Sequence, residues 1–213
     1  IFDRLRIFHM VRVNTDILIR SLLLQVGFVS FLLIGSDFGD VTLAANQILL
    51  QFLYITSYAM DGFTFSAEAL VGQAMGARAR GRLRQSVLMT SAWSLATVVV
   101  LAALFALIGP WLIALMATSP EVRAEALIYL PWMVAAPLLG GPSWIFDGIF
   151  IGATRSRDMR NMMIVSFAIY CLAILLLVDP FANHGLWAAM MVFFVARGAT
   201  LGLRYPALER AAE

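Results

Sequence analysis

Four polar side chains recur at intervals of seven residues within one long apolar segment. They are Gln47, Tyr54, Asp61 and Glu68, with Gln51 and Tyr58 close to the same line. Seven residues advance an α-helix by almost two turns, so these side chains share one stripe about 30 Å long, the depth of a bilayer core. Because polar groups that face lipid are costly, the stripe is expected to face the protein interior or a water-filled cavity.

Asp61 is the acidic residue deepest in this stripe, and Met60, Gly62 and Phe63 flank it in the sequence. An ionisable group inside a membrane is by default a candidate for binding and releasing a proton or a cation. The alternative is a structural hydrogen bond to a neighbouring helix. Glu68 lies nearer to the arginines that follow, either as a second functional carboxyl group or as the interfacial partner of an arginine.

A second deep acidic residue, Asp147, follows a segment that is rich in proline. The prolines of that segment are Pro131, Pro137 and Pro142. Proline removes a backbone donor and clashes with the preceding turn, so this helix is expected to kink or unwind. Because broken helices supply ion and substrate sites in transporters, Asp147 is a candidate site residue. An ion pair with Arg155 or Arg160 is the structural alternative.

Polar residues also open the first apolar span. Asn14 is placed to cap a helix, and Asp16 and Arg20 are four residues apart, which predicts a salt bridge between them. We expect structural roles for these three. The amide of Gln25 lies deeper and either lines a cavity or bridges two helices. Arg197, in the last apolar span, is expected to extend to the headgroups. The deep charges are thus predicted to be acidic.

Transmembrane helices are the elements that would hold these side chains. Hydrophobic residues make up 62% of the 213 residues and charged residues 13%, against about 45–50% and about 25% in soluble domains. Runs of about 20 apolar residues predict six spans. Their ranges are 16–36, 42–75, 84–109, 124–153, 161–179 and 184–204. Residues 1–213 are therefore expected to form one all-α domain, a six-helix bundle surrounded by membrane lipid.

The basic residues, all of them arginines, alternate between the two sides of these spans. One side carries Arg4, Arg6, Arg12, Arg78, Arg80, Arg82, Arg84, Arg155, Arg157, Arg160, Arg204 and Arg210. The connections on the other side carry a single arginine, Arg123. Because arginine is enriched in cytoplasmic connections, both termini are expected to be cytoplasmic. Arginines in short runs between apolar segments are typical of membrane topology and do not indicate a nucleic-acid-binding face.

Common catalytic motifs are absent from the sequence. It contains no GxxxxGK[ST] phosphate loop, no HExxH zinc motif and no GxSxG nucleophile motif. An enzyme is therefore the least supported class of function, and neither a metal nor a cofactor is expected.

Several segments, in order, resemble the multidrug and toxic compound extrusion (MATE) transporters, and most closely their DNA-damage-inducible F (DinF) branch. The segments are 14–20 (NTDILIR), 43–48 (LAANQI), 60–63 (MDGF), 68–78 (EALVGQAMGAR) and 146–154 (FDGIFIGAT). That family has twelve helices in two six-helix lobes around a central cleft. The resemblance implies that this chain is the carboxyl-terminal lobe, helices seven to twelve, and that an amino-terminal lobe is its partner.

The resemblance implies an antiporter of the bacterial inner membrane that exports organic cations or other amphipathic compounds in exchange for H⁺ or Na⁺. Asp147 matches an acidic position of the tenth helix, and Asp61 and Glu68 match the eighth helix of the DinF branch. Gln25 stands at or beside a glutamate of some other branches, which weakens a sodium site there. The alternatives are a lipid-linked precursor flippase, which would need a cationic cavity, and a non-transporting scaffold, which would need no buried carboxylates.

Overall fold

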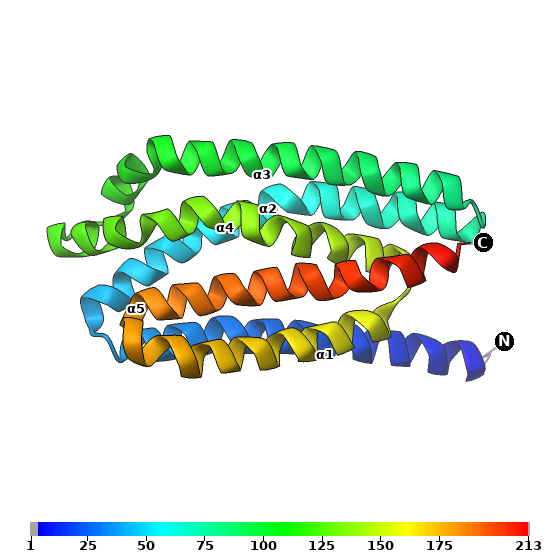
Figure 1. Cartoon of the computed structure of the whole chain (residues 1–213), viewed down its shortest axis with the longest axis horizontal. Coiled ribbons are helices and arrows are strands. Elements are labelled where there is room, and N and C mark those ends of the chain that lie inside the picture. Colours follow the sequence, from blue (N-terminus) through cyan, green and yellow to red (C-terminus); the bar gives the residue numbers. More distant parts are fainter. Residues whose placement is uncertain (1–3, 213) are drawn as a thin grey trace.

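A computed structural model describes residues 4–212, which are helical apart from short connections and contain no strand. Five helices follow one another along the chain. They are α1 (Arg4–Ser36), α2 (Asp40–Gly76), α3 (Arg80–Met116), α4 (Pro120–Gly152) and α5 (Ser156–Arg210). They lie side by side along the long axis of the molecule (Figure 1). The predicted all-α class is confirmed.

The helix α5 consists of two antiparallel arms that meet at Ala182. The backbone of Ala182 is non-helical, with φ 48° and ψ −128°, and the chain reverses direction there (Figure 1). A Cβ on Gly185 would lie 1.9 Å from the carbonyl oxygen of Leu177, so only glycine fits at this position of the bend. The predicted spans 161–179 and 184–204 are these two arms, so five helices provide six helical segments.

Two predicted helix ends are wrong, and of the kink or unwinding predicted for the proline-rich helix the unwinding is not found. The helix α1 begins at Arg4, so Asn14 lies inside it and caps nothing. The helix α3 does not stop at residue 109 but continues through Pro110 to Met116. The helix α4 is not unwound at its three internal prolines. In an apolar environment a continuous helix satisfies most backbone groups, and neighbouring turns accommodate the missing proline donors.

The arginine-rich connections lie at one end of the bundle. The α2–α3 and α4–α5 connections share that end with the start of α1 and the finish of α5, whereas the other two connections and the bend at Ala182 lie at the opposite end (Figure 1). This arrangement agrees with the alternation of arginines in the sequence.

Within residues 4–212, four segments are long and apolar enough to cross a bilayer. They are Met10–Ser36, Arg80–Met116, Pro120–Gly152 and Ser156–Arg210. The helix α2 is not among them, in keeping with Asn46, Gln47 and Gln51 in its first half. Large apolar side chains such as Leu107 and Leu203 are 79% and 81% exposed, as expected for helices that contact lipid.

Two glycines bring α4 into backbone contact with α2. A Cβ on Gly148 would lie 2.3 Å from the carbonyl oxygen of Thr64, and a Cβ on Gly152 would lie 2.4 Å from that of Glu68. These glycines are four residues apart and share one face of α4, an arrangement that lets membrane helices approach closely. The close contact fixes the position of Asp147, which directly precedes Gly148.

Candidate functional site

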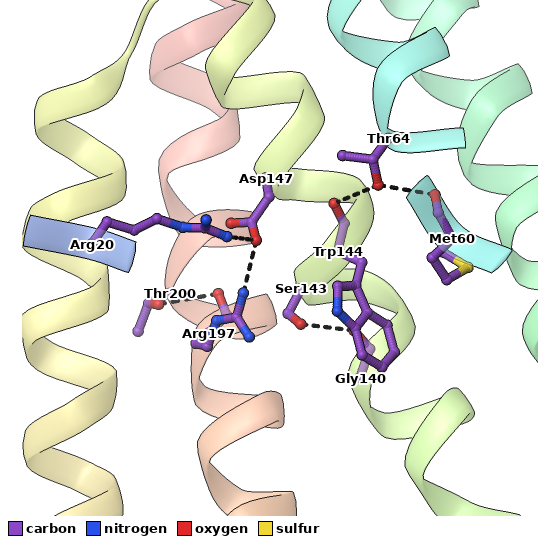
Figure 2. Close-up of polar contacts among 9 residues, drawn as sticks. All are labelled: Arg20, Met60, Thr64, Gly140, Ser143, Trp144, Asp147, Arg197 and Thr200. Carbon is purple, nitrogen blue, oxygen red and sulfur yellow. Dashed lines mark hydrogen bonds and ion pairs between the residues drawn. The ribbon is translucent and has the colours of Figure 1, made fainter. Parts of the chain in front are cut away.

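Asp147 is held by two arginines from two other helices. Arg20 of α1 donates a hydrogen bond to Oδ2 of Asp147, and Nη2 of Arg197 in α5 donates to the same oxygen at 2.7 Å. Figure 2 shows the two guanidinium groups converging on this carboxylate. Asp147 is 5% exposed and Arg197 is 2% exposed. We call Arg20, Asp147 and Arg197 the ion cluster; it joins α1, α4 and the second arm of α5.

The ion cluster carries one more positive charge than negative charge. Its two arginines share a single carboxylate, and within the described part of the chain the Nε atoms of Arg20 and Arg197 are buried without a hydrogen-bond partner. The guanidinium carbon of Arg197 also lies 5.8 Å from the ring centre of Phe193, a distance at which a cation is attracted to an aromatic face. The cluster therefore has two unused N–H donors and one excess positive charge that a further hydrogen-bond acceptor could bind.

Asp16 forms a separate contact near the arginine-rich end of the bundle. The carboxylate accepts a hydrogen bond from Nη1 of Arg160 at 2.5 Å and from the hydroxyl of Ser156 at 3.0 Å. Asp16 is 1% exposed. The predicted pair between Asp16 and Arg20 is wrong, because each side chain reaches a different helix instead of its neighbour on α1.

The partners predicted for Asp147 are also wrong. Arg160 binds Asp16, and Arg155, which directly precedes α5, lies 3.6 Å from Asp158 in the first turn of that helix. Arg197 does not extend to the headgroups but is buried against Asp147. The prediction that the deep charges are acidic is corrected in consequence, because the buried cluster holds two arginines for one aspartate.

A pocket opens between α1 and α2 beside the ion cluster. Its volume is about 290 Å³. It is lined by Ser21, Leu24, Gln25, Phe28, Leu53, Tyr54, Ser57, Trp144, Phe194 and Arg197. The ring centres of Phe28 and Tyr54 are 6.3 Å apart, and those of Trp144 and Phe194 are 5.6 Å apart. We call this the α1–α2 pocket; its walls are mostly aromatic and apolar, with a few polar groups, as in sites for small molecules.

The α1–α2 pocket brings together two of the predicted site residues. Gln25 comes from α1 and Tyr54 from α2, and both are exposed. Arg197 connects them to Asp147, because it lines the pocket and binds that carboxylate. Of the two roles considered for Gln25, lining a cavity or bridging two helices, the structure favours the first, because this side chain lies on a pocket wall.

The remaining residues of the α2 stripe lie apart from this pocket. Gln47 and Gln51 line a second pocket, of about 460 Å³, near the α3–α4 connection at the arginine-poor end. Asp61 and Glu68 are half-buried, and neither forms a hydrogen bond or ion pair within the part of the chain that the structure describes. Asp61 and Asp147 share neither a pocket nor a polar contact among the described residues, and the charge of Asp147 is already paired.

Two polar clusters that the sequence analysis did not predict lie at the arginine-poor end. Asn46 and Asn183 exchange hydrogen bonds of 2.7 and 2.9 Å, and Nε1 of Trp187 donates to Asn46 at 3.0 Å. These three side chains are buried and connect α2 to the bend of α5. Glu125 accepts hydrogen bonds from Thr42 at 2.9 Å and from Tyr129 at 3.3 Å.

The polar residues of these clusters stand out individually in apolar runs, but nothing in their spacing indicates the partner. Asn46 and Asn183 are 137 residues apart in sequence. Among the residues that the structure describes, no group of three or more His, Cys, Asp or Glu side chains is arranged to hold a metal ion.

Comparisons with known proteins were made for the sequence and for the fold. The MatE family model matches residues 17–177. The DNA damage-inducible protein F of Escherichia coli K12 is 37% identical over 193 residues, which are 91% of this chain and 42% of that protein. The matched region is the carboxyl-terminal half of that protein.

Two solved structures share the fold at low sequence identity. A MOP superfamily transporter of Pyrococcus furiosus superposes with a TM-score of 0.81 at 15% identity, over 92% of this chain and 44% of that one. The Vibrio cholerae MATE transporter VcmN, in its bent form, gives a TM-score of 0.83 at 19% identity, over 93% and 45% of the two chains. The chain thus spans less than half the length of these relatives. It is a multi-pass helical membrane protein and belongs to the MatE family.

Proposed function

We propose that this chain is one lobe of an antiporter that exports organic cations or other amphipathic compounds in exchange for H⁺ or Na⁺. The membership of the MatE family supports transport, and the relative from Escherichia coli supports a bacterial inner membrane. Since that relative is matched over 42% of its length, a second lobe is proposed to complete the cleft. The gathering of arginine-rich connections at one end supports cytoplasmic termini.

The α1–α2 pocket is the observation that carries this proposal. Aromatic rings from four helices surround a space of about 290 Å³ that opens on the surface beside Gln25 and Tyr54. This volume is near the lower limit of about 300–1,000 Å³ for small-molecule sites, as expected if a second lobe supplies the opposite wall. Flat rings with few polar groups suit amphipathic compounds of varied shape.

Asp61 and Glu68 are the proposed binding groups for the coupling ion. Both are half-buried on α2 and have no partner among the described residues, so each is available to a proton or a cation. Asp147 is proposed to organise the pocket through Arg197 instead of binding the ion, because its charge is already neutralised. Protonation of Asp61 would remove a charge and shift the balance between inward-open and outward-open states.

The test is transport by the full-length gene product in proteoliposomes, with an imposed proton gradient or sodium gradient. Export of fluorescent amphipathic dyes should follow one of the two gradients and should be lost in Asp61→Asn. The matched control is Asp179→Asn, an exposed carboxylate beside the bend of α5, which should export normally. Unchanged, gradient-driven export in Asp61→Asn would remove Asp61 as a binding group for the coupling ion, and unchanged export in Asp147→Asn would remove the organising role proposed for Asp147.

A lipid-linked precursor flippase is the second candidate function. It requires a cationic cavity for phosphate groups, and Arg197 on the wall of the α1–α2 pocket supports it. The two candidates differ in cargo: a flippase would move a phosphate-bearing lipid between leaflets and would leave soluble dyes inside the vesicle.

A further inference from the structure

We propose that the α1–α2 pocket selects amphipathic compounds with an anionic head, such as a carboxylate, sulfonate or phosphate on a flat apolar body. This inference rests on the proposed transport function, because it names the chemical class that the same pocket would take. It narrows that function to the amphipathic compounds that are not cations.

The charge beside the pocket is the first observation in favour of an anion. Arg197 is the charged residue on the pocket wall, and it belongs to a cluster of two arginines and one carboxylate. Asp16, one helical turn from Arg20 on α1, is already bound by Arg160 and Ser156. It is therefore already engaged, and a cationic ligand in the pocket would lie beside a cluster that carries one positive charge in excess.

The unused donors of the cluster are the second observation. Nε of Arg197 and Nε of Arg20 are buried and have no acceptor among the described residues. A buried donor without a partner is destabilising, and more so when the group is charged. A guanidinium group matches a carboxylate or phosphate in both charge and planar geometry. An anionic head bound beside Arg197 would supply an acceptor to this guanidinium group.

The walls of the pocket suit the body of such a compound. Tyr54 and Phe28 come from one side, and Trp144 and Phe194 from the other. Gln25 adds an amide at the opening. Flat aromatic surfaces bind a flat apolar body by stacking and burial of area, while Arg197 fixes the position of the head.

The experiment compares two probes that share one body, pyrenebutyrate and pyrenebutyl-trimethylammonium. Their affinities for the full-length protein are measured by quenching of protein fluorescence in nanodiscs of phosphatidylcholine. The anionic probe should bind on the order of tenfold more tightly, a difference typical of one favourable charge contact. Arg197→Gln should abolish this preference. Equal or tighter binding of the cationic probe by the unaltered protein would overturn the inference.

A second variant keeps the inference testable if Arg197→Gln fails to fold. Ser57 lines the same pocket and lies outside the ion cluster; Ser57→Asp adds a negative charge there and should reverse the preference. The matched control is Ser66→Asp, an exposed serine of the same helix that faces another pocket, and it should leave the preference unchanged. A preference unaffected by Ser57→Asp would place the selectivity outside this pocket and overturn the inference.

Nanodiscs of phosphatidylglycerol separate a lipid headgroup from a soluble anion. If an anionic lipid is the natural occupant, phosphatidylglycerol should displace pyrenebutyrate; if a soluble compound is, the affinity should be unchanged. Both results support the anionic class. Export of the cationic probe in preference to the anionic one would contradict this inference alone, whereas export of neither probe under any gradient would contradict the proposed function itself.

Discussion

Arg197 and Asp147 meet at 2.7 Å inside the bundle, although the two residues come from different helices and Arg197 lies 50 positions further along the chain. The contact places a cation on the wall of the α1–α2 pocket and a carboxylate behind it. It changes the role of Asp147 from a free acidic group to the centre of an ion cluster. The stability of the lobe and the character of the pocket therefore depend on the same side chains.

Removal of the charge of Asp147 is expected to destabilise the protein. In Asp147→Asn the two buried arginines would lose their counter-ion, and breaking a buried pair from one side costs about 3–5 kcal/mol. The free energy of unfolding of the full-length gene product, measured in detergent, checks this. Asp61→Asn is the control, since Asp61 has no partner among the described residues, and its stability should be nearly unchanged. Equal effects of the two substitutions would contradict the ion cluster.

Asp16→Asn should destabilise the protein less than Asp147→Asn. It weakens the hydrogen bonds from Arg160 and Ser156, at a cost of about 1–3 kcal/mol. The side chain of Arg160 is 29% exposed, so water compensates part of the loss. Asn14→Ala, two residues earlier at an exposed position, should be neutral in the same unfolding measurement. A larger effect at Asn14 than at Asp16 would contradict the contacts of Asp16 and would favour Asn14 as a helix cap.

Alanine at Gly148 or Gly152 should separate α4 from α2. The added Cβ would lie 2.3 or 2.4 Å from a backbone oxygen of α2, and backbone has little freedom to move away. Overpacking of this kind costs about 1–3 kcal/mol or more. Gly62→Ala on α2 is the control because nothing lies within 4 Å of its Cβ position. The prediction fails if thermal stability is the same for all three variants.

Loss of the Asn46 amide should loosen the bend of α5. Asn46→Ala would leave Asn183 and Nε1 of Trp187 without their partner in a buried site, at about 1–3 kcal/mol. Hydrogen exchange of the peptides that span Ala182 should accelerate. Thr15→Ala, which removes an exposed hydroxyl bonded only within α1, should leave that exchange unchanged, and acceleration in both variants would argue for a general loss of stability instead.

The sequence predicts the helices better than it predicts their contacts. Apolar runs and arginine-rich connections locate all six helical segments, because length and charge placement are local properties. The continuation of α3 past Pro110 and the continuous α4 could not be predicted, because a proline's effect depends on the surrounding helices. The bend at Ala182 joins two predicted spans into one helix for the same reason.

For the candidate site, too, the sequence predicts individual residues better than it predicts their contacts. The stripe on α2 identifies Tyr54, and an isolated amide identifies Gln25, but their common pocket depends on the packing of α1 against α2. Asp16 and Arg20 are correctly spaced for a pair, yet each finds a partner more than 120 residues away in the chain. The sequence predicts Arg197 at the interface because a buried arginine is rare, and its contact with Asp147 explains why it is buried instead.

Accessibility of the α1–α2 pocket to water tests the central claim most directly. Gln25→Cys and Tyr54→Cys, made in a Cys171→Ser background of the full-length gene product, would be labelled in membranes with a charged maleimide. Both should react rapidly, and pyrenebutyrate should slow the reaction, whereas Leu175→Cys on a lipid-exposed position should stay unlabelled. Labelling of Gln25→Cys and Tyr54→Cys no faster than of Leu175→Cys would contradict a wet pocket in this lobe.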